Sequence, residues 1–130
     1  MRSRKVIPLD APPPSGIFVR TPSGHAYYVK DGRALSVSEI HLDSWRPHVI
    51  QITEMAFRTL EPGGKLGFRD GTLVKDFGDG RIYLISDSKR CHVTDPIAYE
   101  ALGGRKWEIT APSEYLRVHP EGEEIGNPNA

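Results

Sequence analysis

Two stretches of the chain repeat one another: residues 16–37 read GIFVRTPSGHAYYVKDGRALSV, and residues 71–93 read GTLVKDFGDGRIYLISDSKRCHV. The glycines that open them match, and after one extra residue in the second copy's first loop Tyr27 matches Tyr83. Self-similarity at a period of about 55 residues predicts a duplicated structural unit.

Within each stretch the residues predict three short strands. Asp31-Gly32 stands between the second and third strands of the first copy and is a strong hairpin signal, and Asp87-Ser88 is a weaker signal at the matching place. The expected strands are 17–20, 26–30 and 34–37 in the first copy, and 72–75, 82–86 and 90–94 in the second.

The rest of each copy predicts a short helix, a strand and a last helical turn. In the second copy Asp95 can cap the helix, Pro96 suits its first turn and Gly103 can end it. Ile52-Thr53 and Ile109-Thr110 are matched as equivalent strand residues. The fold class expected is α+β, dominated by β-structure, with two tandem copies of a small antiparallel hairpin and short-helix module.

The predicted organisation has four parts. Residues 1–15 form a Pro-rich extended arm, and three consecutive prolines in it favour polyproline geometry. Residues 16–65 are the first module and 66–122 the second. Residues 123–130 are expected to be a flexible acidic tail. The arm is either a disordered leader or a tether that orders on a partner subunit.

Composition excludes several classes of protein. The 17 basic and 17 acidic residues give no net charge, so no nucleic-acid partner is expected, because such a partner requires a basic surface. No apolar run has the length of a membrane-spanning helix, so no membrane insertion is expected. No secretory signal peptide is recognisable.

Residues that suggest chemistry have simpler explanations. Cys91 matches Leu35 in the repeat and is expected to be a small core residue. The five histidines lack metal-ligand spacing and are expected to be scattered on the surface, so neither a metal nor a cofactor is expected. No phosphate loop or nucleophile elbow occurs, so the chain is not expected to be an enzyme and no catalytic residue is assigned.

Aromatic and basic residues are the candidates for binding. Tyrosines lie on the second strands, where they either pack in the core or, if exposed, stack on sugars or anchor an interface. Basic residues follow the hairpin turns, as a solvated face or a rim that meets an acidic neighbour. The binding candidates are Tyr28, Arg33, Trp45, Lys89, Arg90 and Trp107.

Residues 66–126 resemble repeats of actinobacterial secreted and cell-wall-associated proteins, and of virion proteins of phages that infect those hosts. The likeness rests on GTLVK at 71–75, IYLIS at 82–86, KR at 89–90, HVT at 92–94, DP at 95–96, ALG at 101–103, Trp107 and PEG at 120–122. Residues 16–64 match more loosely. The resemblance implies a non-catalytic module and supplies no catalytic residue.

Two functions are therefore expected as alternatives. One is a structural protein of a phage virion, a minor tail protein or capsid-associated protein, made in the bacterial host cytoplasm. It is expected to bind other virion subunits, and to form a homo-oligomer or be assembled in many copies. The other is a carbohydrate-binding or cell-wall-binding module, or a tail-tip adhesin that contacts the host envelope. Exposed Tyr28, Trp45 or Trp107 along a groove would favour the second.

Overall fold

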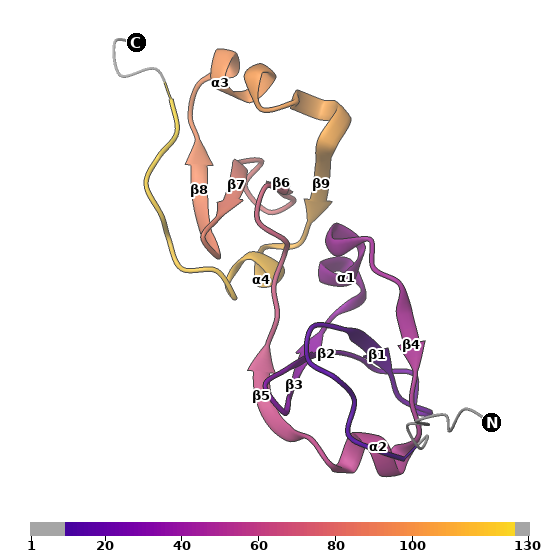
Figure 1. Cartoon of the computed structure of the whole chain (residues 1–130). Coiled ribbons are helices and arrows are strands. Elements are labelled where there is room, and N and C mark those ends of the chain that lie inside the picture. Colours follow the sequence, from indigo (N-terminus) through magenta and orange to yellow (C-terminus); the bar gives the residue numbers. More distant parts are fainter. Residues whose placement is uncertain (1–9, 127–130) are drawn as a thin grey trace, which may run out of the picture. The chain divides into compact units, whose positions relative to one another are not determined.

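The computed structural model describes residues 10–126 and divides the chain into two compact units (Figure 1). The first unit comprises the described residues up to Glu39 together with Arg46–Leu66. The second comprises Ile40–Trp45 and the residues from Gly67 onward. The units differ from the predicted modules 16–65 and 66–122 in two respects: Leu66 belongs to the first unit, and residues 40–45 belong to the second.

The first unit contains one five-stranded sheet in the order β4-β1-β2-β3-β5 and one short helix. Strands β1 and β2, and β2 and β3, pair antiparallel, whereas β4 and β5 pair parallel to β1 and β3. The elements are β1 (Phe18–Arg20), β2 (Ala26–Lys30), β3 (Arg33–Val37), β4 (Val49–Gln51), α2 (Glu54–Arg58) and β5 (Glu61–Lys65).

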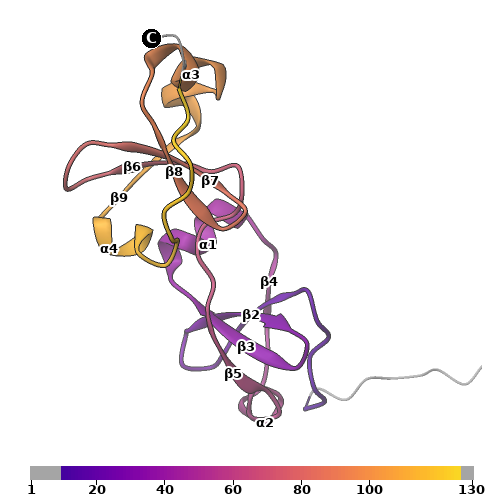
Figure 2. The same ribbon diagram turned by 90° about the vertical axis from the view of Figure 1, so that its left-hand side faces the viewer.

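The second unit repeats this order as β9-β6-β7-β8, and the segment 121–125 runs parallel beside β8 (Figure 2). Ile125 donates its amide hydrogen to His92 and accepts one from Thr94, so this part of the acidic tail is held against β8. The elements are α1 (Glu39–Trp45, from Ile40), β6 (Leu73–Asp76), β7 (Ile82–Ser86), β8 (Lys89–Val93), α3 (Pro96–Ala101), a 3-10 turn η1 (Gly104–Trp107), β9 (Glu108–Ala111) and α4 (Ser113–Leu116).

The α+β, β-dominated class predicted from sequence is confirmed, but both sheets are mixed rather than antiparallel. Local turn chemistry decided the hairpins correctly: Lys30 pairs with Arg33, and Ser86 with Lys89. The parallel pairs bring together residues about 30 apart in the chain, as in Val19 with Ile50, and no local pattern predicts them.

The register corrects one sequence match. Val19 pairs with Ile50 in the first unit and Val74 pairs with Ile109 in the second. Ile50 is therefore the counterpart of Ile109, and the match of Ile52 with Ile109 was wrong by two residues. The residues matched between the two hairpins are confirmed by the strand register. Tyr28 pairs with Leu35 in the first unit, and their counterparts Leu84 and Cys91 pair in the second.

Each sheet buries its own apolar residues. The second unit has a core cluster of Phe68, Val74, Ile85, Ala111 and Leu116, against which Ile40 packs. In the first unit Val19 and Val29, the counterparts of Val74 and Ile85, are fully buried. Buried Cys91 has the core position that its match with Leu35 predicts.

The two hairpin turns generate a paired prediction about stability. Ser88 has a φ of 61° and its counterpart Gly32 a φ of 76°, and glycine tolerates this region far better than serine. Ser88→Gly should raise the free energy of unfolding by about 0.5–1 kcal/mol, and Gly32→Ser should lower it by about 1 kcal/mol. Calorimetry of both variants measures this. Shifts of the same sign in both would contradict the assignment.

Candidate functional site

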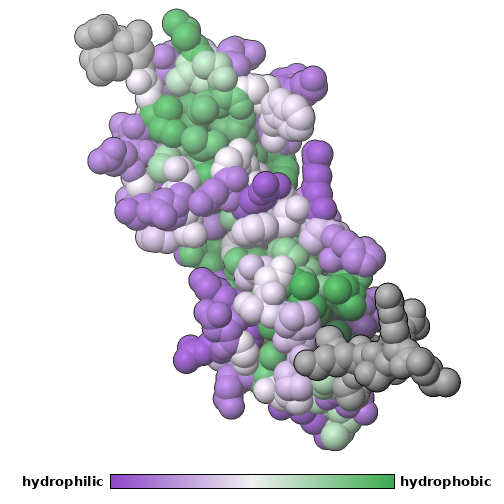
Figure 3. All heavy atoms as spheres, viewed as in Figure 1, coloured by the Kyte–Doolittle hydropathy of each residue, from purple (hydrophilic) through white to green (hydrophobic). Residues whose placement is uncertain are grey.

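Five large apolar side chains of the described residues are exposed. Two lie on β4 and α2, two on α3 and η1, and one in the β6–β7 turn; the exposed fractions are 38% for Ile50, 58% for Met55, 73% for Ile97, 54% for Trp107 and 77% for Phe77. Figure 3 shows hydrophobic surface around α3. Exposed apolar side chains that gather in one place mark sites of association more often than isolated ones do.

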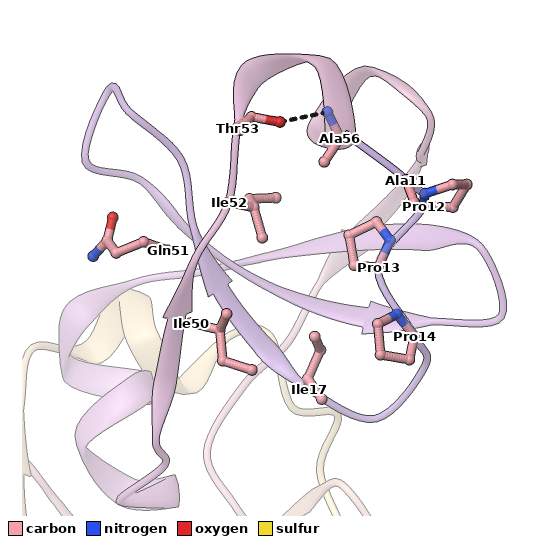
Figure 4. A pocket seen from close by; sticks show the side chains of 10 residues that line it. All are labelled: Ala11, Pro12, Pro13, Pro14, Ile17, Ile50, Gln51, Ile52, Thr53 and Ala56. Carbon is pink, nitrogen blue, oxygen red and sulfur yellow. Dashed lines mark hydrogen bonds between the residues drawn. The ribbon is translucent and has the colours of Figure 1, made fainter. Parts of the chain in front are cut away.

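The first unit has an apolar cavity of about 500 Å³ beside the exposed Ile50. Figure 4 shows prolines of the segment 11–14 on one side and isoleucines of the sheet on the other. The side chains that line it are Ala11, Pro12, Pro13, Pro14, Ile17, Ile50, Gln51, Ile52, Thr53 and Ala56.

The described end of the N-terminal arm forms one wall of this cavity. The Thr53 hydroxyl donates a hydrogen bond of 2.6 Å to Asp10, and the Ser15 hydroxyl accepts one of 3.1 Å from the amide of Asp31. Residues 10–15 are thus fixed on their own unit. Residues 1–9, the rest of the predicted arm, lie outside the described residues, as do residues 127–130 of the predicted tail.

The cavity offers little polar chemistry. Prolines have no amide hydrogen to donate. The Thr53 hydroxyl accepts from the amide of Ala56 as the cap of α2 and donates to Asp10, so it is already used. The Gln51 side chain points away from the prolines (Figure 4). With these side chains the cavity suits an apolar group and has nothing to activate a substrate.

A polar pocket of about 250 Å³ in the second unit contains the buried Asp76. Asp76 accepts hydrogen bonds from the Ser113 hydroxyl at 2.5 Å and from the amide of Gly78 at 2.7 Å. Burial alone would raise the pKa of Asp76, but these donors outweigh it and lower the pKa. Its counterpart, Thr21, is also buried and holds the equivalent turn, so Asp76 has a structural role.

Two histidines correct the expectation that all five lie on the surface. His119 is 3% exposed, and its Nε2 accepts a hydrogen bond of 2.9 Å from the amide of Phe68. Its Nδ1 lies 2.7 Å from the carbonyl of Ser88, so Nδ1 carries the proton. His41 is 7% exposed and its Nε2 donates to the carbonyl of Tyr115 at 2.8 Å. Both rings pack as core residues.

Sequence spacing could not reveal this pair, because residues 41 and 119 come together only in the folded second unit. The glycine at position 67 is the one feature of the sequence that relates to this packing. A Cβ at this position would overlap the ring of His119, so only glycine fits there.

The structure does not gather the six predicted binding residues into one site. Tyr28 is half-buried, with its ring 4.9 Å from that of Phe18, and Trp45 is half-buried and donates to the carbonyl of Gly67 at 2.9 Å. Trp107 alone of the three aromatic candidates is exposed, and Lys106 Nζ lies 5.6 Å from its ring.

The basic candidates are also dispersed. Arg33 and Lys89 are exposed at matching positions of different units. Arg90 is half-buried and donates to the carbonyls of Leu116, at 3.4 Å, and His119. It therefore holds the end of the chain against β8 rather than projecting as a free cation.

Within residues 10–126, no group of three or more His, Cys, Asp or Glu side chains is arranged to hold a metal ion. Across the same part of the chain, no helix is long and apolar enough to cross a membrane.

The chain is thus a two-unit α+β protein with an apolar cavity in its first unit. No protein-family model matches the sequence. Comparison with curated proteins finds no match. Comparison with solved structures also finds none.

His119 predicts a pH dependence of stability. Burial of the His119 ring is the main cause that lowers its pKa below the usual 6.5, although the hydrogen bond to the carbonyl of Ser88 acts in the opposite direction. Above pH 6.5 the ring is neutral in both states, and the stabilisation that the neutral buried ring gives the fold is fully present. As the pH falls below 6.5, His119 of the unfolded chain takes up a proton before that of the folded chain, so the free energy of unfolding decreases. Urea unfolding at pH 7.5 and 5.5 should show this loss, reduced in His119→Gln.

His48→Gln, at an exposed histidine, is the matched control and should keep the loss seen in the unmodified chain. An equal loss in the His119→Gln variant would show that other groups cause the pH dependence.

Proposed function

We propose that the chain is a non-catalytic structural subunit of a phage virion, a minor tail or capsid-associated protein that acts through protein–protein contacts. The observation that carries the proposal is the apolar cavity beside Ile50, together with exposed Ile97 on α3. The lining is mostly apolar, and its one amide side chain, that of Gln51, points away from the prolines. Such a cavity suits an apolar protein segment better than a substrate, because a substrate requires groups that orient it.

The placement in a virion is supported by the resemblance of residues 66–126 to modules of actinobacteriophage virion proteins. Small subunits that assemble in many copies gain stability from their neighbours, which suits units of this size. Partners would be other virion subunits or further copies of the chain.

A second candidate, binding of cell-wall glycan as a tail-tip adhesin, is favoured by one observation. Trp107 is 54% exposed, and an exposed indole can stack on a sugar ring. The other aromatic candidates are half-buried, and the cavities beside Ile50 and Asp76 are lined by none of the three.

Two measurements separate these functions. Immunogold electron microscopy of phage particles released by lysis of the producing cells should place the chain at a fixed position on each particle. Titration of the ¹⁵N-labelled chain with soluble peptidoglycan fragments should leave its amide resonances unchanged. Amide shifts at Trp107 and its neighbours would favour the glycan-binding function. Particles that carry no label would contradict the placement of the chain in a virion.

A further inference from the structure

A short helix packs on the core of the second unit, but no helix packs at the corresponding position of the first unit. In the second unit α1 lies against the segment 67–69, which leads into β6, and against α4. Ile40 packs on the core cluster, and the His41 ring lies 4.5 Å from that of Phe68. The amide of Arg69 donates to the Ser44 hydroxyl at 3.0 Å. We call this place the helix seat.

The cavity of the first unit is the equivalent seat, without a helix. Because Gly16 matches Gly71, Pro13 is the counterpart of Phe68, and the sheet register makes Ile52 the counterpart of Ala111. Phe68 and Ala111 are 2% and 0% exposed, whereas Pro13 and Ile52, which line the cavity, are only half-buried.

Conversely, α3 is a helix without a seat. It follows β8 as α1 follows β3, so that Ile97, four residues after Val93, corresponds to His41, four residues after Val37. His41 is 7% exposed but Ile97 is 73% exposed. No residue of α3 is buried.

The exposed face of α3 is firmly held. Asp95 caps the helix by accepting from the amide of Ile97 at 3.1 Å. The Tyr99 hydroxyl donates to Glu108 on β9, and this bond raises the pKa of Tyr99 to about 12. A fixed helix loses little conformational entropy when it binds, so its apolar side chains are prepared for a partner.

We propose that α3 and η1 of one chain bind in the cavity of a second copy, as α1 does in the seat of the second unit. Charge favours this pairing, since Arg105 and Lys106 of η1 are exposed and Asp10, held by the Thr53 hydroxyl beside the cavity, is also exposed. The contact is head-to-tail, so it generates a ring or an open filament of chains. This inference rests on the proposed function and specifies one of its partners, a second copy of the chain.

Sedimentation equilibrium of the whole chain tests this proposal. One short helix buries less area than a standard interface, so association is measured from about 1 µM to 1 mM. Ile97→Glu should weaken it at least about tenfold, and Ile50→Glu likewise, because each places an unpaired carboxylate in the contact. Phe77→Glu, at an exposed apolar residue outside both surfaces, is the matched control and should associate like the unmodified chain.

A mixture of the two variants tests the head-to-tail contact most sharply. The Ile97→Glu variant keeps its cavity and the Ile50→Glu variant keeps its helix, so together they should form one dimer of twice 14.5 kDa and nothing larger. Circular dichroism checks that both fold. If Ile50→Glu does not fold, ¹⁵N-labelled Ile97→Glu is titrated with the unmodified chain, and shifts should centre on residues 11–17 and 50–56.

Absence of self-association, or association that both variants retain, would overturn the inference. The proposed function has its own readout, because particles labelled by immunogold would still place the chain in a virion when this interface fails.

Discussion

The structure depends on the packing of residues 40–45 inside the second unit. A repeat of about 55 residues is near the lower limit at which a single chain can bury an adequate core. The second unit overcomes this limit with α1, whose Ile40 packs on the core cluster and whose His41 contacts Phe68. The hydrogen bonds of His41, Ser44 and Trp45 fix the helix there.

The same constraint explains where apolar surface remains exposed. When a helix is buried in one copy of a duplicated fold but its counterpart is not, apolar surface stays uncovered at both places. The first unit has a seat lined by prolines and isoleucines, and the second carries Ile97 on α3. The Thr53 hydroxyl beside this cavity caps α2 and donates to Asp10, and most of the remaining lining is apolar, as expected of a surface that contacts an apolar partner.

Much of the fold follows from local sequence, and the remainder from contacts that no local pattern records. Asp31-Gly32 and Asp87-Ser88 predict both hairpins because a turn needs only adjacent residues. The parallel strands, the assignment of α1 to the second unit and the burial of His41 and His119 all join residues distant in the chain. Of the site, sequence named Trp107 as a binding candidate and the prolines as extended, but it placed residues 10–15 in a free arm or on a partner rather than on their own unit. It did not indicate the cavity, because the wall opposite the prolines is the parallel strand β4.

Helix α1 completes the core of the second unit, and a nuclear Overhauser experiment on the whole chain tests this packing most directly. The rings of His41 and Phe68 have centroids 4.5 Å apart, and those of His41 and Tyr115 are 5.4 Å apart. Cross-peaks from the His41 ring protons to both aromatic rings are the predicted result. A well-dispersed spectrum in which assigned His41 protons show neither cross-peak would contradict the account.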